Sequence, residues 1–167
     1  QEAFDDTAAE LQESSMITGI AGKKGFSVIT MTKNGMSSEL GVIRRVLEIL
    51  ERYHINVEYI PSGIDSVSLV VEAAKAAPYL YQALGDMEKE IKPDSLHVTD
   101  GMAVVPAVGG KMAFQPGSSG KIFAKLGENG INIRMITQGP EELNIIVGVD
   151  SADFEKAIRV LYNSFVK

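Results

Sequence analysis

The chain offers few side chains that could carry out catalysis. Its 167 residues include only two histidines, His54 and His97, and no cysteine. His54 stands at the end of an expected helix and His97 in a short expected strand, positions where imidazole groups serve structure more often than catalysis. The sequence contains no HExxH or GxSxG motif and no carboxylate–histidine spacing suited to a metal ion. We therefore expect neither catalytic residues nor a metal site in this chain.

Two segments rich in glycine and lysine superficially resemble phosphate-binding loops. They read GGK at 109–111 and GSSGK at 117–121. The second segment departs from the Walker pattern at both ends, because Ile122 stands where Ser or Thr is required and Gln115 where the first glycine belongs. We interpret these glycines as residues that permit positive φ where a strand turns into a helix.

A pair of acidic residues, Glu39 and Glu58, offers more informative chemistry. Glu39 precedes an expected helix that begins near Gly41, and Glu58 lies in the strand expected after that helix. Free backbone N–H groups and the helix dipole favour a carboxylate at a helix start, and nearby acidic side chains can bind an amino group. The pattern therefore indicates a site for a small zwitterion. Two simpler interpretations stay open, because an acid near a helix start is favourable by itself and Glu58 can be an ordinary exposed strand residue.

The elements that position these acids belong to a sequence repeat with an offset of 76 positions. Such self-similarity predicts one structural unit used twice. In the second copy Gln115 and Arg134 stand where the first has Glu39 and Glu58, so the acidic pair belongs to the first copy. The positions shared in register are Gly41/Gly117, Val46/Ile122, Leu47/Phe123, Leu50/Leu126, Ile55/Ile131, Asn56/Asn132, Val57/Ile133, Ile60/Ile136 and Gly63/Gly139.

Each copy follows the order strand, helix, strand, strand, helix, and the first copy adds a fourth strand. Apolar periodicity predicts the strands of the first copy at 26–31, 56–60, 66–72 and 95–99, and its helices at 41–54 and 79–91. In the second copy it predicts strands at 102–108, 132–138 and 144–150, and helices at 117–129 and 152–166. The βαββαβ order with an antiparallel sheet predicts an α+β fold of two ferredoxin-like units.

The second copy lacks a fourth strand, whereas a β-rich segment at 16–21 precedes the first copy. The economical solution is that this early strand completes the second sheet, because a bare sheet edge is a liability. The first unit, 25–100, would then be inserted in a second, discontinuous unit made of 16–21 and 102–167. Segment 16–21 could instead form an independent edge strand or exchange between chains. Residues 1–15 are expected to be a linker or a disordered start.

The composition narrows the class of protein further. Hydrophobic residues make up 45% and charged residues 23% of the chain, as in soluble globular proteins. A formal net charge of −6 argues against a nucleic-acid partner. No apolar run approaches the roughly 20 residues that span a bilayer. The absence of cysteine and of a secretory signal fits a cytoplasmic location.

Three segments of the chain together resemble a known protein family. They read MITGIA at 16–21, GVIRRVLEILERYHINVEYIPSGID at 41–65 and GINIRMITQG at 130–139. Over residues 16–167 the sequence resembles the tandem ACT-domain regulatory region of aspartate kinases. The resemblance also implies the inserted arrangement of the two units. It further implies an allosteric module that binds an end product of the aspartate pathway and inhibits a separate kinase domain. That kinase domain, which would use ATP and Mg, is absent from this chain, so we expect no cofactor and no catalysis here.

In that family the effector lies between the first ACT units of two chains. Lysine is favoured over threonine as the effector, because two acids near a pocket suit the extra ammonium of lysine. Glu39 is a departure, since lysine-sensitive members often have serine there. Threonine sensing and a ligand-free dimerisation module are the alternatives. The expected partners are a second copy, bound through the ACT units, and the kinase domain, with no nucleic acid and no membrane. The effector-binding positions implied by the resemblance are Met36, Ser38, Glu39, Gly41, Val42, Asn56, Val57, Glu58, Ser62, Gly63, Ile64 and Asp65.

Overall fold

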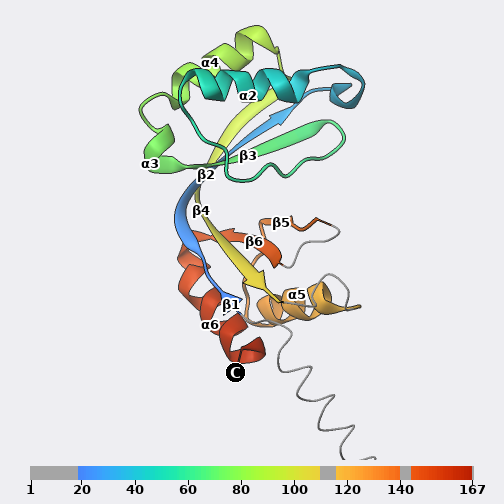
Figure 1. Ribbon diagram of the computed structural model, residues 1–167, viewed down its shortest axis with the longest axis vertical. Coiled ribbons are helices and arrows are strands. Elements are labelled where there is room, and N and C mark those ends of the chain that lie inside the picture. Colours follow the sequence, from blue (N-terminus) through green and yellow to red (C-terminus); the bar gives the residue numbers. More distant parts are fainter. Residues whose placement is uncertain (1–18, 110–115, 140–143, 167) are drawn as a thin grey trace, which may run out of the picture. The chain divides into compact units, whose positions relative to one another are not determined.

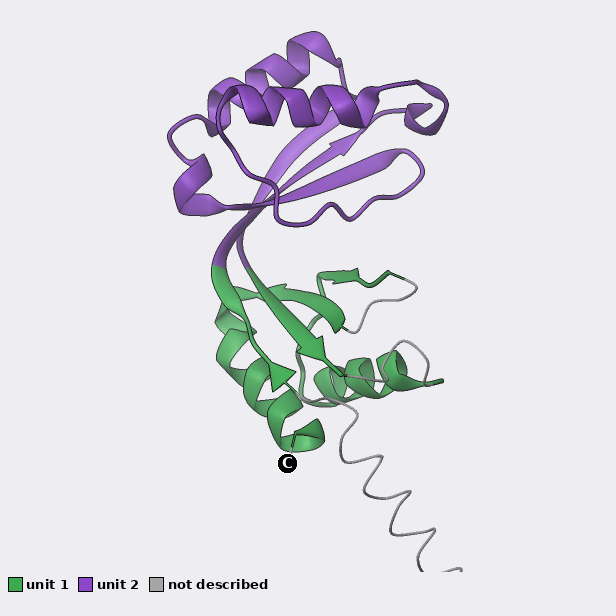
Figure 2. Cartoon of the chain, in the orientation of Figure 1, with its two compact units in different colours: residues 1–24, 103–167 green, residues 25–102 purple. Residues whose placement is uncertain are grey.

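The computed structural model describes residues 19–109, 116–139 and 144–166 (Figure 1). The chain divides into two compact units (Figure 2). One unit, which we call the inserted unit, is formed by Gly25–Met102, and the other, the outer unit, by the residues up to Lys24 together with those from Ala103 onward. The chain crosses between the units within two strands, β2 (Lys23–Thr32) and β4 (Ser95–Val108).

The inserted unit has an antiparallel sheet whose central strands are β2 and β3 (Ser66–Glu72). The pairing of β2 with β3 runs from Phe26 opposite Glu72 to Thr32 opposite Ser66, and β4 lies on the other side of β2. Two isolated bridges, Tyr59 to Val70 and Ser62 to Val67, place the segment 58–62 along the outer edge of β3. This strand order is that of the ferredoxin-like fold.

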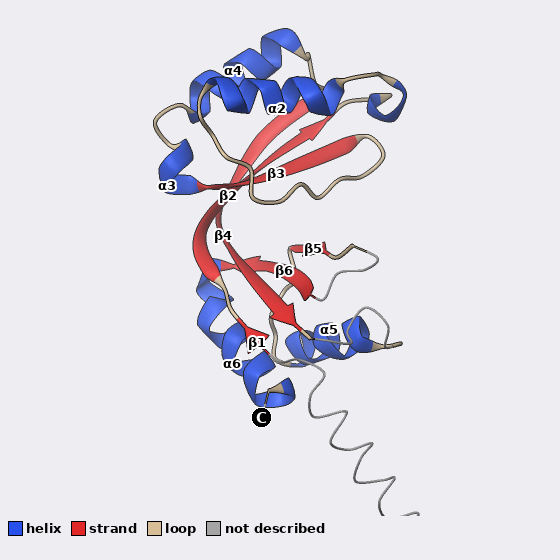
Figure 3. Cartoon of the chain, viewed as in Figure 1, coloured by secondary structure: helices blue, strands red, loops and turns tan. Residues whose placement is uncertain are grey.

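Two helices of the inserted unit, α2 (Val42–Arg52) and α4 (Leu80–Glu90), cover one face of its sheet (Figure 3). Apolar side chains at helical spacing turn toward the strands, where alternate residues point to the same face. The buried core includes Val46, Leu50, Ala83, Met87, Ile29, Met31, Leu69 and Val71. Two shorter elements complete the unit, the 3-10 helix η1 (Met36–Ser38) and helix α3 (Ala73–Ala76).

The outer unit repeats this plan with strands from distant parts of the sequence. Strand β1 (Gly19–Ile20) pairs antiparallel with the end of β4, where Gly19 faces Val108. The sheet order continues from β4 to β6 and then to β5. The remaining elements are β5 (Met135–Thr137), β6 (Asn144–Asp150), α5 (Ser118–Glu128), η3 (Ser151–Asp153) and α6 (Phe154–Phe165). The predicted α+β class of two ferredoxin-like units is therefore confirmed.

Several expected elements differ in the structure. The strands expected at 95–99 and 102–108 form one strand, β4, in which Gly101 adopts a φ of 69°. The strand expected at 56–60 is reduced to isolated bridges, since Pro61 has no N–H to donate to a ladder. In the same position of the outer unit, the strand expected at 132–138 is shortened to β5. Helix α3 was not predicted. Residues 1–15, the first three residues of 16–21, and residues 110–115, which include part of the GGK segment and Gln115, lie outside the described residues.

Candidate functional site

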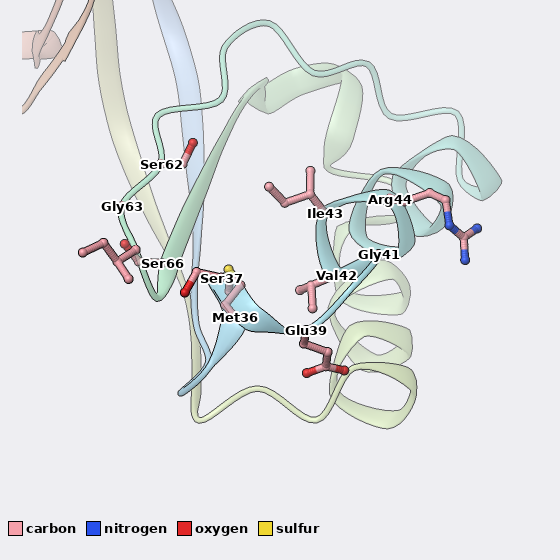
Figure 4. A pocket seen from close by; sticks show the side chains of 11 residues that line it. Met36, Ser37, Glu39, Gly41, Val42, Ile43, Arg44, Ser62, Gly63 and Ser66 are labelled. Carbon is pink, nitrogen blue, oxygen red and sulfur yellow. The ribbon is translucent and has the colours of Figure 1, made fainter.

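A pocket of about 420 Å³ opens in the inserted unit between the start of α2 and the turn that precedes β3 (Figure 4). A volume of several hundred Å³ is typical of sites for small molecules. The lining residues are Met36, Ser37, Glu39, Gly41, Val42, Ile43, Arg44, Ser62, Gly63, Ile64 and Ser66.

The loop between β2 and α2 is shaped by two glycines. Gly35 and Gly41 have φ values of 75° and 80°, a left-handed conformation that glycine adopts without strain. Buried Met36 and Val42 anchor the loop in the core. The backbone N–H of Lys33 donates to the carbonyl of Asp65 at 3.0 Å. That bond joins the loop to the turn before β3, so the two walls of the pocket are tied together.

The first turn of α2 forms one wall of the pocket. Its N-cap residue, Gly41, provides no side-chain cap, and the first turn contains no acidic residue. The backbone N–H of Arg45 donates to the carbonyl of Gly41 at 3.0 Å, whereas the N–H groups at a helix start before that point have no acceptor within the helix. These groups and the helix dipole suit a ligand carboxylate.

Hydroxyl groups line the opposite wall, where Figure 4 shows Ser62 and Ser66 across from Ile43 and Val42. Serine hydroxyls can both donate and accept hydrogen bonds, so this wall can bind an amino or hydroxyl group of a ligand. Gly63 lies close to Ser66, because a Cβ placed at Gly63 would approach the Ser66 Oγ to 2.8 Å. Alanine at position 63 would therefore force the Ser66 hydroxyl to move.

Glu39 lies at the edge of the pocket with its charge already balanced. Arg45 Nη2 donates to Glu39 Oε1 at 2.7 Å, and Lys33 Nζ lies 3.5 Å from Glu39 Oε2. The hydrogen bond from Arg45, opposed by partial desolvation and helped by Lys33, lowers the pKa of Glu39 below its ordinary value. In Figure 4 the carboxylate points away from Ile43 and Ser62. In this structure Glu39 thus faces two cations rather than the interior of the pocket.

A second hollow of about 520 Å³ lies at the other end of α2. Its lining residues are Leu47, Glu51, His54, Ile55, Asn56, Val57 and Ile60. Glu58 does not line this hollow or the first pocket. Its side chain is exposed and accepts a hydrogen bond from Asn56 Nδ2 at 3.1 Å, while its backbone N–H donates to Val70 at 2.8 Å. The two acids singled out from the sequence therefore lie at different places in the inserted unit.

The structure brings together most of the residues named from the family resemblance. Those that line the pocket are Met36, Glu39, Gly41, Val42, Ser62, Gly63 and Ile64. Asn56 and Val57 line the second hollow, and Ser38, Glu58 and Asp65 line neither. The pocket also contains Ser37, Ile43, Arg44 and Ser66, which are not among the positions that the resemblance implies. Ile43 could have been identified from helical spacing, because it directly follows Val42 and therefore lies beside the buried face that Val42 and Val46 define.

Large apolar side chains are exposed on the pocket walls and next to them in the chain. Leu40, next to Glu39 and Gly41 in the chain, is 96% exposed, and Ile64 on the opposite wall is 78% exposed. Ile43 is also exposed. Clustered exposed apolar side chains of this size mark a surface that contacts another molecule.

The outer unit has the same glycine at the start of its helix, but other residues stand where the inserted unit has Glu39 and Glu58. Gly117 has a φ of 82° at the start of α5, as Gly41 does at the start of α2. Arg134, the counterpart of Glu58, donates from Nη1 to Asp150 Oδ1 at 2.6 Å. Gln115, the counterpart of Glu39, lies outside the described residues.

The described residues hold neither a cluster of side chains suited to a metal ion nor a helix that could span a membrane. No group of three or more His, Cys, Asp or Glu side chains among them is arranged to hold a metal ion. No helix in the same part of the chain is long and apolar enough to cross a membrane.

Comparison with known proteins gives a consistent result. A family model described as ACT domain matches residues 105–165. The chain is 32% identical over 150 residues to Aspartokinase 3 of Bacillus subtilis, a match that covers 89% of this chain and 33% of that protein. It is 29% identical over 163 residues to the aspartokinase of Schizosaccharomyces pombe, covering 98% of this chain and 31% of that protein. The chain thus spans about a third of the length of these curated relatives.

Solved structures agree with this result. Aspartate kinase from Clostridium acetobutylicum superposes with a TM-score of 0.86 and 47% identity over 89% of this chain and 34% of that chain. The regulatory subunit of aspartate kinase from Thermus thermophilus gives a TM-score of 0.76 and 26% identity, covering 90% of this chain and 98% of that chain. The second match spans nearly the whole of a polypeptide that is itself a regulatory subunit.

Proposed function

Because the chain is a tandem ACT-domain region of the aspartate kinase type, we propose that it senses an amino acid and regulates a kinase domain. The observation that carries this proposal is the pocket at the start of α2, which combines an uncapped helix terminus with a wall of hydroxyl groups. The helix start would bind the α-carboxylate and the hydroxyl wall the α-amino group. This chain itself would bind the effector and catalyse nothing.

Lysine is the first candidate for the effector. Glu39 at the edge of the pocket is the nearest acidic group for an ε-ammonium, which would reach it in competition with Arg45 and Lys33. Threonine is the second candidate, because Ser37, Ser62 and Ser66 could pair with its hydroxyl group.

The effector would be enclosed by a second copy of the inserted unit. The open pocket and the exposed side chains of Leu40, Ile43 and Ile64 support this arrangement, since covering them removes apolar surface from water. A ligand-free dimerisation module is the competing function, and it would use the same surface.

Regulation would follow from differential affinity. An effector that binds one arrangement of the dimer more tightly shifts the population toward that arrangement, and the kinase domain responds to the shift. An effector that bound both arrangements equally would regulate nothing.

Calorimetric titration of the chain with lysine, threonine and methionine tests the proposal, together with the melting temperature at each ligand concentration. A sensor binds at least one of them and melts at a higher temperature when it is present, because a ligand that prefers the native state stabilises it. If all three fail to bind at millimolar concentration while sedimentation still shows a dimer, the dimerisation module is the correct function.

A further inference from the structure

The surroundings of Glu39 contain an arrangement that the resemblance did not anticipate. Both oxygens of its carboxylate face cations, since Oε1 accepts from Arg45 at 2.7 Å and Oε2 lies 3.5 Å from Lys33. Lys33 is itself held in place, because its Nζ also donates to the carbonyl of Ile91 at 2.8 Å. Glu39 can therefore approach a ligand only if it gives up part of this pairing.

Arg45 and its neighbour Arg44 differ sharply in their environments. The Arg44 side chain is 74% exposed, pairs with Glu48 one turn further along α2, and points away from the pocket in Figure 4. The Arg45 side chain is 33% exposed and pairs with Glu39 across the loop that leads into the helix. Because Arg44 itself lines the pocket, the control for the loss of a positive charge is Lys75, which is exposed and pairs with Glu72 away from the pocket.

The position of Arg45 carries an energetic cost. Its Nε is buried and has no hydrogen-bond acceptor within the described residues. Buried donors without a partner are rare in native structures and lose the hydrogen bond that water would supply. The Arg45 guanidinium stays in this position despite the cost, and its Nη2 donates to Glu39. A surface ion pair formed for stability alone would leave the remaining donors in water, as Arg44 does.

With Glu39 turned aside, the interior of the pocket is apolar and hydroxylic. Met36 and Ile43 supply apolar surface, and Ser37, Ser62 and Ser66 supply hydroxyl groups. Such an interior accepts a neutral ligand side chain without difficulty, whereas an unpaired ammonium in it would be costly.

We propose that Arg45 sets the selectivity of the pocket for the charge of the ligand side chain, because it occupies the carboxylate of Glu39. This inference rests on the proposed amino-acid binding. In the wild-type chain the ligand ammonium competes with Arg45 for Glu39, so a basic side chain gains little over a neutral side chain of the same length. Without Arg45 the carboxylate retains Lys33 at 3.5 Å as its cation, and a basic ligand gains a charge-assisted contact.

Two ligands isolate the contribution of the ammonium, since norleucine is lysine without its side-chain amino group. The dissociation constants of L-lysine and L-norleucine are measured by calorimetry for the wild-type chain and for Arg45→Met, Lys75→Met, Glu39→Gln and the double variant Arg45→Met with Glu39→Gln. Arg45→Met is expected to raise the preference for lysine over norleucine by roughly five-fold or more, as a gained charge-assisted contact does. Lys75→Met should change this ratio by less than about two-fold, as a surface charge does. The double variant should return to the wild-type ratio, because the carboxylate is gone.

A second readout needs no ligand. The pKa of Glu39, followed by NMR, should rise toward its ordinary value in Arg45→Met and stay where it is in Lys75→Met. The same spectra show whether each variant is folded.

The outcomes separate the inference from the proposed function. If both ligands bind Arg45→Met with the wild-type ratio, or if the pKa of Glu39 does not respond, Arg45 is not the selectivity residue and the proposed function still holds. If neither ligand nor any other amino acid binds the wild type or the variants, the proposed function fails and the inference fails with it.

Discussion

The ammonium of Lys33 donates to the carbonyl of Ile91 at 2.8 Å, so the loop that leads to the pocket is fixed to the end of α4. The side chain reaches that carbonyl from the end of β2 and is only 18% exposed. A cation at a helix C-terminus is favourable because the last carbonyl groups have no donors within the helix. Two further bonds act beside it, from the Asn34 N–H to Asp94 at 2.6 Å and from the Asp94 N–H to Thr32 at 2.8 Å. The pocket loop is thereby joined to the chain just before β4, the strand that continues into the outer unit.

Replacement of Lys33 by methionine should destabilise the protein by about 1–2 kcal/mol, because a charge-assisted hydrogen bond to a helix end is lost from a largely enclosed position. Urea denaturation of the whole chain measures the change. Lys75→Met is the control, since Lys75 is exposed and pairs with Glu72 only three residues away, and its effect should stay below about 0.5 kcal/mol. Equal losses in the two variants would show that Lys33 does not secure the loop.

Gly63→Ala should weaken effector binding with little loss of stability. The added methyl group would lie 2.8 Å from the Ser66 Oγ, so Ser66 must move and the hydroxyl wall changes shape. We expect a loss of about 1 kcal/mol in binding, or roughly five-fold in the dissociation constant for the effector. The double variant Gly63→Ala with Ser66→Ala removes the clash together with one hydroxyl group. If affinity is unchanged in Gly63→Ala, this wall does not contact the ligand.

The regular strands were predictable from the sequence because their side-chain patterns are local. Strands β3 and β6 have the predicted bounds, 66–72 and 144–150, where a run of buried β-branched and apolar residues ends at polar ones on both sides. The prediction of a continuous strand at 56–60, on the edge of the sheet, was wrong. The two bridges, Tyr59 to Val70 and Ser62 to Val67, share one register, but Pro61 between them has no N–H to donate, so the edge does not become a continuous ladder.

The part of the candidate site that is formed by the loop and the helix start was predictable from the sequence. The pairing of Glu39 with Arg45 was not foreseen, because the five residues between them cover a left-handed turn at Gly41 as well as the first turn of α2. Helical spacing does not apply across such a turn. The sequence therefore identified an acid near the pocket but could not tell that its charge is already balanced.

Gly85→Ala should stabilise the protein. Gly85 lies in the middle of α4, and a Cβ placed there meets no atom within 4 Å. Glycine is a poor helix former because it loses more backbone entropy on folding, so alanine should add about 0.5–1 kcal/mol. Gly41→Ala is the contrasting variant, since its φ of 80° strains any residue with a side chain, and it should destabilise. Urea denaturation of both variants checks the two signs, and a loss of stability in Gly85→Ala would contradict the packing described for α4.

The contact between α2 and α4 should make stability depend on pH in the acid range. Arg52 donates to Glu90 at 2.8 and 3.0 Å and to Asp86 at 3.0 Å, and the Tyr53 hydroxyl donates to Asp86 at 2.5 Å. The Tyr53 hydrogen bond is the main cause that lowers the pKa of Asp86, and the Arg52 hydrogen bond lowers the pKa of Glu90. Both carboxyl groups lose protons more readily in the folded chain than in the unfolded one. Their contribution is therefore complete above the ordinary pKa values of 3.8 and 4.5 and is lost as the pH falls through the lowered ones.

Arg52→Met tests this pH dependence directly. Without the guanidinium, Glu90 loses the main cause of its lowered pKa and Asp86 one of the lesser causes, so the variant should be less stable than the wild type at neutral pH. The difference should shrink as the pH is lowered below the ordinary pKa values, because protonated carboxyl groups gain little from Arg52 in either chain. Urea midpoints measured at neutral pH and at successively more acid values follow this convergence. Arg44→Met, which removes an exposed pair within α2, should show a small difference that varies little with pH. If the deficit of Arg52→Met stays constant down to the acid end, the cluster is not what links stability to pH, and Arg52 contributes through the packing of its aliphatic stem.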